Sequence, residues 1–349
     1  MGTAIGLPSQ RQQQRARPPP APLAQQQPRP LPPSQPQLTP HNRLPSVLID
    51  SLSSYYYGEP DQGWGPSEAP LAPGEALAPG YRVVGHLRRG SRLDVYDVWS
   101  EERSCRCIAK TVRPERAADE CAVGWLRNEG VLLTQFAHPH LVRGYEIVQA
   151  ERPLRPVVIT ETLPGHTLGF LIEEFGRLRP IDTAVLGIQL CSVLGYLHRR
   201  GWVHLDVKPS NVVEVGGRAV LLDLSLACRI GERSSAGTFD YLSPEQAGGG
   251  EMTPAADTWG LGTTLYEALS GTTPWAEVSH RQRSSNGTRY YPQRDTTAAP
   301  LRTHRRLPAA LSRTVDACLI ADPKSRPTVA EVADQLIAWS GMNPETIDA

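Results

Sequence analysis

Short apolar runs separated by turn residues fill the chain from Tyr81 to about residue 162. The runs YRVVGHL, LDVYDVWS and CRCIAKTV follow one another closely, which predicts an antiparallel meander of strands. The segment CAVGWLRNEGVLLTQFA instead spaces its apolar positions as a helix does, at Val123, Leu126, Gly130 and Leu133. Two further β-rich runs, LVRGYEIVQA and RPVVITETL, complete this half of the chain.

From residue 163 onwards the apolar pattern becomes mainly helical. Ala184–Arg200 predicts a strongly apolar helix, and Ala256–Gly271 predicts a second helix that ends at its glycine. A β-rich half followed by a helical half indicates an α+β protein with two lobes. We expect a small β-rich N-lobe at residues 80–162 and a larger helical C-lobe at residues 163–342.

Residues 1–79 have a different composition. The first 40 residues contain 11 prolines and 9 glutamines, and no aromatic residue precedes Tyr55. Such a segment buries too little apolar surface to offset its ordering entropy, so we predict a disordered tail and linker. RPPPAP and RPLPPSQP are candidate polyproline II ligands for a partner protein. Ser46–Tyr57 is the exception, and it is interpreted as a short docking element or a marginal helix.

Charge and cysteine content narrow the class of partner and compartment. The formal net charge is zero, which favours neither nucleic acid nor an anionic membrane as a partner. No apolar run approaches the ~18 residues of a membrane span, so no membrane segment is expected. The six cysteines form no metal-binding pattern and indicate reduced thiols in a cytoplasmic protein.

A basic insertion interrupts the helical half at about residues 278–306. From His280 to Arg306 it has seven arginines against one acidic residue. We expect this insertion to be solvated and mobile; the alternative is a docking site for an acidic partner.

The stretch HLDVKPSN, from His204 to Asn211, groups a carboxylate, an ammonium and an amide within six positions. Its central Pro209 indicates a loop, because strands and helices tolerate an interior proline poorly. Polar loops between apolar runs are where chemistry tends to occur. Taken alone, Asp206 and Asn211 would be ordinary turn residues.

This loop and several other motifs together resemble a protein Ser/Thr kinase domain of the bacterial, eukaryotic-like type. HLDVKPSN resembles the kinase catalytic loop HRDLKPxN, and CIAK resembles the strand motif VAIK. DLS (Asp223–Ser225) stands where DFG is expected, and SPE (Ser243–Glu245) stands where APE is expected. The motifs occur in the family's order over residues 80–342, so the resemblance implies a two-lobed kinase fold that uses ATP and Mg²⁺.

By this resemblance, four residues are candidate catalytic residues. Lys110 would hold the α- and β-phosphates of ATP, and Glu129 would pair with it. Glu120 is an alternative partner nearer the start of the same helix. Asp206 would be the base that orients the substrate hydroxyl, and Lys208 would steady the transferred phosphate.

The resemblance also implies the residues that bind nucleotide and metal. Asn211 and Asp223 would hold Mg²⁺ through hard oxygen atoms. Thr160 would be the gatekeeper before a hinge at residues 161–163. The candidate nucleotide-binding residues are Gly90, Val95, Ala109, Lys110, Glu161, Leu163, Asn211 and Asp223.

The phosphate-covering loop departs most from the family pattern GxGxxGxV. Arg88, Gly90 and Leu93 occupy the three glycine positions, so only one glycine remains. Glycine there lets backbone N–H groups approach the phosphates. Arg88 or Arg89 is a candidate source of compensating charge.

Other positions are expected to support the site. Thr238 would bond the catalytic base, Glu245 would pair with Arg326, and Asp257 would anchor the catalytic loop. Leu205 stands where most regulated kinases carry an arginine, whose guanidinium pairs with a phosphate on the activation loop. Since leucine carries no charge, we predict activity that does not depend on activation-loop phosphorylation.

Three functions fit the motifs. The first is ATP- and Mg²⁺-dependent transfer of the γ-phosphoryl group to Ser and Thr hydroxyls of protein substrates, including the kinase itself. The second is a pseudokinase that binds partner proteins with little or no phosphotransfer, which the eroded glycine loop, Leu205 and Ser225 favour. The third is a kinase of small molecules, which is disfavoured because GTFDYLSPE resembles the ledge on which a polypeptide substrate lies.

Overall fold

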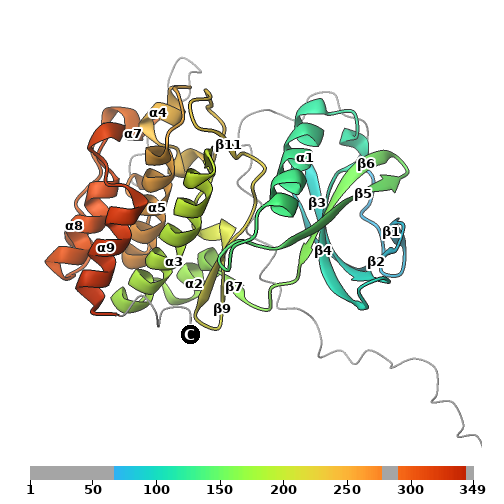
Figure 1. Ribbon diagram of the computed structural model, residues 1–349, viewed down its shortest axis with the longest axis horizontal. Helices are drawn as coiled ribbons and strands as arrows, with labels where there is room; N and C mark the ends of the chain where they lie inside the picture. The colour runs from blue at the N-terminus through green and yellow to red at the C-terminus, as the bar shows by residue number, and fades with distance from the viewer. Residues whose placement is uncertain (1–66, 277–289, 343–349) are drawn as a thin grey trace, which may run out of the picture. The chain divides into compact units, whose positions relative to one another are not determined.

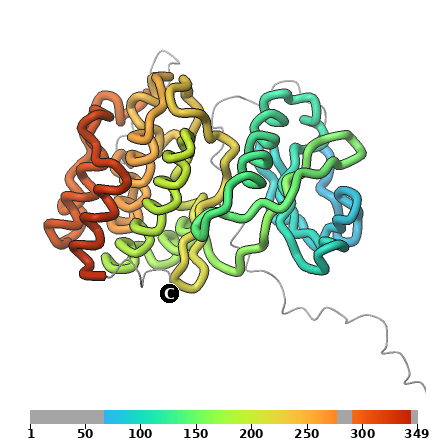
Figure 2. Tube along the Cα trace, viewed as in Figure 1, coloured from blue at the N-terminus to red at the C-terminus, as the bar shows by residue number. Residues whose placement is uncertain are grey.

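The computed structural model describes residues 67–276 and 290–342. Within these residues the chain forms a sheet-based N-lobe followed by a helical C-lobe (Figure 1). The lobes are consecutive in the chain, as Figure 2 shows by blue to green segments in one lobe and green to red segments in the other. The predicted fold class, α+β with two lobes, is confirmed.

Six antiparallel strands form the N-lobe sheet, in the spatial order β1-β2-β3-β4-β6-β5. Their bounds are β1 Ala76–Ala78, β2 Tyr81–Arg89, β3 Leu93–Ser100, β4 Cys105–Val112, β5 Gly144–Glu151 and β6 Leu154–Glu161. The β3–β4 pairing sets Val95 opposite Lys110. Directly opposed residues share a face of a sheet, so both side chains lie on the same side.

Helix α1, Glu120–Gln135, packs on this sheet. Asp119 caps its first turn by accepting a backbone hydrogen bond at 3.0 Å. A glycine allows the closest approach, because a Cβ at Gly130 would lie 2.5 Å from Ile147 Cγ1. The helix therefore lies tightly against β5 and carries Glu129 on its buried side.

The N-lobe begins earlier than the composition predicts. Residues up to 79 are expected to form a tail and linker, whereas Leu77 is buried in the sheet core and β1 pairs with β2. Leu71 packs against the same core, and its N–H donates to Tyr96 Oη at 3.2 Å. Composition does not predict β1 and the segment before it, because their few apolar residues are separated by proline and glycine. The candidate docking segment Ser46–Tyr57 lies outside the described residues.

The C-lobe is built mainly from helices, and α3, α5, α8 and α9 surround its apolar core. The helices are α2 Leu168–Phe175, α3 Pro180–Arg199, α4 Pro244–Ala247, α5 Pro254–Ser270, α7 Pro292–Asp295, α8 Ala309–Cys318 and α9 Val329–Ser340. Two small sheets complete the lobe, one of β7 His166–Thr167, β9 Val212–Val215 and β10 Arg218–Leu221, the other of β8 Trp202–Val203 and β11 Cys228–Arg229.

Helix α3 is, among the described residues, the one helix long and apolar enough to cross a membrane by length and composition. This corrects the expectation that no apolar run reaches the required length. The most apolar window of the helix is 61% buried inside the protein, where Leu190, Val193 and Leu194 are inaccessible to solvent. The central helix of a folded core has the same composition, so α3 is weak evidence for a membrane span.

The described part of the basic insertion, residues 290–306, packs into the C-lobe. Leu301 is buried in the main core, and Gln293 Nε2 donates to a backbone carbonyl at 3.0 Å. Arg305 Nη1 donates to the Leu178 carbonyl at 2.8 Å. The insertion therefore contacts the C-lobe through these three side chains, while Arg294, Asp295, Arg302 and Arg306 are exposed, as the expectation of a solvated segment implies.

We expect a deletion of residues 1–66 and a deletion of residues 1–75 to differ in thermal stability. Composition alone predicts that both are silent. The longer deletion also removes the packing of Leu71 and its bond to Tyr96, so it should cost about 1–3 kcal/mol. Thermal unfolding of both truncated proteins beside the full chain measures this. Equal melting temperatures for the two deletions would contradict the place of residues 67–75 in the fold.

Candidate active site

Three charged side chains from separate elements meet beneath the N-lobe sheet. Lys110 extends from β4, Glu129 extends from α1, and Asp223 follows β10. Lys110 Nζ donates to the two Glu129 oxygens at 2.7 and 2.9 Å, and to Asp223 Oδ2 at 2.7 Å. Of the two carboxylates considered from the sequence, Glu129 is therefore the one that pairs, and Glu120 lies exposed at the start of the helix.

Burial and the neighbouring charges together set the pKa values of this triad. Burial alone would lower the pKa of Lys110, but the carboxylates of Asp223 and Glu129 outweigh it and raise that pKa above its ordinary value. Burial, with the neighbouring Asp223 carboxylate, raises the pKa of Glu129 to about 7. For Asp223, burial is outweighed by the Lys110 ammonium, which lowers the pKa below its ordinary value. Lys110 and Asp223 are therefore charged at neutral pH.

The backbone turns sharply at Asp223. Its φ is 66°, in the left-handed region that non-glycine residues adopt rarely. Aspartate tolerates this region because its short side chain can bond locally, and here Oδ1 accepts the Ser225 N–H at 2.9 Å. The other carboxylate oxygen is then left to contact Lys110.

Helix α1 is joined to the segment that follows Asp223. Leu224 lies in the same buried apolar cluster as Leu132 of the helix. Asn128 Nδ2 donates to the Ala227 carbonyl at 3.0 Å. Since Asn128 directly precedes the glutamate that pairs with Lys110, this bond ties the position of the ion pair to that of the downstream segment.

A mostly apolar cleft opens beside Lys110. Such a cleft, with a few charged groups at one end, suits a small ligand. Of the candidate nucleotide-binding residues and the gatekeeper, the lining contains Val95, Lys110, Thr160, Glu161, Leu163 and Asp223. Gly90 and Asn211 do not line it.

Ala109 does not line the cleft either, which corrects the assignment made from the sequence. Side chains alternate across a strand, so Ile108 and Lys110 share the cleft face and Ala109 lies on the other. Ala109 is fully buried there, in the core cluster with Val98. Ile108 occupies the position of the alanine in VAIK, and its larger side chain narrows the cleft.

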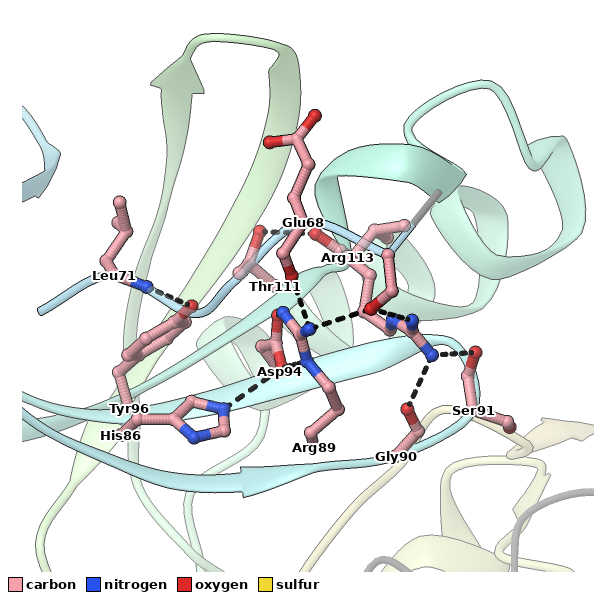
Figure 3. A network of polar contacts seen from close by, with 12 residues as sticks. Glu68, Leu71, His86, Arg89, Gly90, Ser91, Asp94, Tyr96, Thr111 and Arg113 are labelled. Atoms are coloured by element: carbon pink, nitrogen blue, oxygen red, sulfur yellow. Dashed lines mark hydrogen bonds and ion pairs between the residues drawn. The ribbon is translucent and has the colours of Figure 1, made fainter. Parts of the chain in front are cut away.

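The two arginines that were candidates for compensating charge are the last residues of β2, and they lie on opposite faces of the sheet. The Gly90 N–H donates at 2.8 Å to the carbonyl three residues onward, which closes the turn between β2 and β3. Arg88 is opposed to Val95 and shares the cleft face. Arg89 instead donates to both oxygens of Asp94, at 2.8 and 2.9 Å (Figure 3). Arg89 therefore lies on the face away from the cleft, so Arg88 remains the candidate.

Asp206 is held by donors from three residues. Its Oδ1 accepts from Thr238 Oγ1 at 2.7 Å, which confirms the expected threonine contact. Its Oδ2 accepts from Asn211 Nδ2 at 2.8 Å, and Lys208 Nζ lies 2.9 Å from the same oxygen. Lys208 Nζ also donates to Thr238 Oγ1 at 2.6 Å. The carboxylate and the ammonium therefore have one fixed arrangement.

The backbone of this loop is anchored from α5 by Asp257, as the sequence predicts. Asp257 Oδ2 accepts the His204 N–H and Oδ1 accepts the Leu205 N–H, each at 2.8 Å. His198 Nε2 lies 2.8 Å from the same carboxylate. These bonds hold Leu205 at a φ of 66°, a conformation that leucine adopts rarely without such support.

The predicted pair of Glu245 and Arg326 is present deeper in the C-lobe. Arg326 Nη1 and Nη2 donate to the two carboxylate oxygens at 2.7 and 2.8 Å. The same guanidinium donates to three backbone carbonyls and lies over the Trp259 ring. The end of the SPE motif is therefore fixed to the helical core.

An uncharged side chain joins the activation segment, residues 223–245, to the catalytic loop. Gln246 Nε2 donates to the Leu205 carbonyl at 2.9 Å and also to the Ala236 carbonyl. Gly237 passes so close that a Cβ there would lie 2.7 Å from Gln246 Nε2. One amide thus joins the activation segment to the catalytic loop at the position where Leu205 replaces arginine.

The motifs did not identify Gln246 or Asn128 as positioning residues. Gln246 had a partial signal, because Ser243 and Gln246 have the spacing of a capping box and form one at the start of α4. That pattern predicts the cap but not the long-range bonds of the amide. Asn128 had no signal beyond its place next to the glutamate.

Comparison with known proteins agrees with this geometry. Residues 81–337 match the family model described as protein kinase domain. The chain is 30% identical over 286 residues to the serine/threonine-protein kinase PknB of Mycobacterium tuberculosis, covering 78% of this chain and 43% of that protein. It is 33% identical over 218 residues to a probable serine/threonine-protein kinase PknB of Bifidobacterium longum, covering 57% of this chain and 31% of that protein.

The chain belongs to the protein kinase family. The curated relatives that it matches are bacterial serine/threonine-protein kinases, which agrees with the family type that its motifs resemble. The chain spans less than half the length of the curated relatives that it matches. For the Mycobacterium leprae protein, too, the matched part is 43% of its length.

Proposed function

We propose that this kinase transfers the γ-phosphoryl group of ATP to Ser and Thr hydroxyls of protein substrates, including other copies of itself. One observation carries the proposal. Lys110 contacts Glu129 and Asp223 at the same time, so the charges that phosphoryl transfer requires are assembled within one cleft. Positioning and charge stabilisation are most of what this reaction asks of a protein.

The nucleotide would occupy the cleft beside Lys110. Its base would lie between Val95 and Leu163, next to the hinge carbonyls, and its α- and β-phosphates would meet Lys110. Arg88 shares this face and would add positive charge where two glycines of the family pattern are missing. Gly90, at the tip of the turn, would approach the phosphates through its backbone.

The residues present fit a magnesium ion. Asn211 and Asp223 are both buried and offer hard oxygen atoms, and the lowered pKa of Asp223 keeps its carboxylate ionised. Bound Mg²⁺ would supply charge neutralisation at the phosphate oxygens.

The protein substrate would react at Asp206. Its carboxylate, fixed by Thr238 and Asn211, would orient the attacking hydroxyl and take its proton. Lys208 would steady the phosphoryl group during transfer, because its ammonium lies within 2.9 Å of the base. The Thr238 segment would support the polypeptide.

The direct test is incubation of the purified full chain with γ-labelled ATP and a Ser/Thr peptide, with and without Mg²⁺. We expect label on the peptide and on the chain only when Mg²⁺ is present. Absence of transfer over a range of peptides and Mg²⁺ concentrations would overturn the proposal and favour the alternative of a pseudokinase that binds partner proteins.

Asn211→Ala and Asp223→Ala should both lower turnover by weakening metal retention. Since Asn211 contributes a neutral ligand, excess Mg²⁺ should partly rescue Asn211→Ala, whereas Asp223→Ala should remain inactive. Turnover measured against Mg²⁺ concentration tests this. Unchanged activity in Asp223→Ala would remove its assignment as a metal ligand.

A Ser234→Ala/Ser235→Ala double variant should retain peptide kinase activity after phosphatase treatment. The reason is that Gln246, and no arginine at position 205, joins the activation segment to the catalytic loop. Thr238 stays unchanged because it bonds Asp206. A loss of about tenfold or more, equivalent to about 1.4 kcal/mol of barrier, would mean that another cation reads a phosphate there.

The alternative of a pseudokinase has one specific observation in its favour. Ile108 narrows the cleft on the side where the family motif has alanine.

A cytoplasmic location is proposed on the grounds that all six cysteines are free thiols, which suits a reducing compartment. The polyproline ligands remain a prediction, since those segments lie outside the described residues.

A further inference from the structure

Two arginines converge on one serine hydroxyl at the edge of the N-lobe. Arg89 Nη1 donates to Ser67 Oγ at 3.1 Å, and Arg113 Nη2 donates to the same oxygen at 3.0 Å. Ser67 itself is exposed. It belongs to the segment that leads into β1, on the far side of the sheet from Lys110.

Both guanidinium groups are fixed before any ligand arrives. Arg89 is held by its two bonds to the buried carboxylate of Asp94 (Figure 3), and its Nη1 donates to the Glu68 carbonyl as well as to Ser67 Oγ. Arg113 Nη1 donates to the carbonyls of Gly90 and Ser91, at 3.4 and 3.3 Å. Arg113 therefore links the serine to the turn between β2 and β3.

The charge around this site favours an added anion. Arg89 and Arg113 each pair with one acid, Asp94 and Glu115. Two more arginines of the same corner, Arg92 and Arg116, contact the Asp119 carboxylate. Figure 3 shows the Glu68 carboxylate extending away from Arg89 and Arg113.

A neutral hydroxyl offers two guanidinium groups only one acceptor oxygen and no negative charge. A phosphate at this position would bring a charge of about −2 and three acceptor oxygens, which suit paired arginines. Docking would need little side-chain rearrangement, because the donors already point at the oxygen that would carry the phosphate. Preorganisation of this kind lowers the entropy lost on binding.

We propose that Ser67 is a phosphorylation site whose phosphate is received by Arg89 and Arg113, fastening the segment before β1 to the β2–β3 turn. The proposal rests on the proposed function, because the enzyme that phosphorylates Ser67 would be a second copy of this kinase. In that reaction Ser67 Oγ forms a bond to the γ-phosphorus of ATP. The bond from that phosphorus to the β,γ-bridging oxygen breaks, ADP leaves, and the hydroxyl proton passes to Asp206 of the second copy.

A phosphate on Ser67 would also affect the β2–β3 turn, which is proposed to cover the nucleotide. Because Arg113 bonds both Ser67 and the carbonyls of Gly90 and Ser91, a phosphate on Ser67 would restrain the turn through one side chain. The modification would therefore act on the turn from the opposite face of the sheet, without entering the cleft.

The receiving site can be tested without kinase activity, in the full chain carrying genetically encoded phosphoserine at position 67. Titration followed by ³¹P NMR should show the second phosphate pKa lowered from its ordinary value near 6 by about one unit or more. Arg113→Gln should return it toward that value, and phosphoserine placed at Ser104, in the exposed turn after β3, should show no such shift. The melting temperature should also rise by about 2–4 °C with phosphate at 67 and not at 104.

A phosphate at 67 that titrates as at 104, with no rise in melting temperature, would overturn the proposal. Phosphorylation of Ser67 by this kinase is tested by incubating the unmodified chain with ATP and Mg²⁺ and mapping the phosphorylated residues by mass spectrometry. Phosphate at other positions but not at Ser67 would overturn this step while leaving the proposed function intact. No phosphate at any position, with no transfer to peptides, would count against the proposed function itself, and the titration would still decide the receiving site.

Discussion

An Asp206→Asn variant is expected to lose about 10²–10⁴-fold in turnover while keeping its fold, the range that a positioned base typically contributes. The asparagine retains an oxygen that can accept from Thr238, so the loop keeps that contact. Its amide nitrogen, however, would face Asn211 Nδ2 and Lys208 Nζ, which are themselves donors. The variant therefore loses both the proton acceptor and the counter-charge of Lys208.

The matched control for this variant is Asp182→Asn. Asp182 undergoes the same chemical change in an exposed pair with Arg179 at the start of α3, where little should follow. Turnover with a peptide substrate, nucleotide affinity and melting temperature should be measured for both proteins. We expect nucleotide affinity to change far less than turnover in Asp206→Asn. Turnover within about tenfold of the unmodified chain would remove Asp206 from the catalytic role.

Arg326→Met is expected to destabilise the C-lobe by about 3–5 kcal/mol, because it leaves the partly buried Glu245 carboxylate without its partner. The Arg326 side chain is fully inaccessible to solvent, and that of Glu245 is 14% exposed. The substitution also orphans three backbone carbonyls that the guanidinium now satisfies. For a domain of this size the melting temperature should fall by roughly 10 °C.

Two further variants separate charge from geometry. Arg326→Lys keeps the charge but not the fork of donors, so its loss should be intermediate. Arg179→Met removes an arginine from an exposed ion pair and should change the stability little, because solvent screens such pairs. Urea unfolding at equilibrium measures all three. Equal losses for Arg326→Met and Arg179→Met would show that burial does not set the strength of the pair.

The order of the elements follows directly from sequence patterns, because strand and helix periods are local properties. The ion-pair partners Glu129 and Arg326 were instead implied by the resemblance to the kinase family. Helix bounds are less exact for an equally local reason. The apolar pattern predicts a helix over Ala184–Arg200, whereas α3 begins at Pro180, since proline at the first position of a helix starts it without an apolar signal. The helix predicted over Ala256–Gly271 likewise begins at Pro254.

The errors at the site come from information that a motif does not carry. CIAK matches the family by order, but only the alternation of a strand decides which side chain faces the cleft, and it selects Ile108 over Ala109. The two arginines at the turn are adjacent in sequence and lie on opposite faces for the same reason. The bonds of Gln246 depend on a chain reversal that no local pattern encodes.

The bond from Asn128 to the Ala227 carbonyl makes helix α1 and the activation segment mechanically coupled. A ligand or partner that displaces α1 must break the contact of Glu129 with Lys110 and also pull on the segment that positions the protein substrate. The two halves of the site are then gained or lost together, so intermediate states with a disengaged helix and an intact substrate ledge should be sparsely populated. Displacement of α1 would then remove charge stabilisation and substrate positioning in one step.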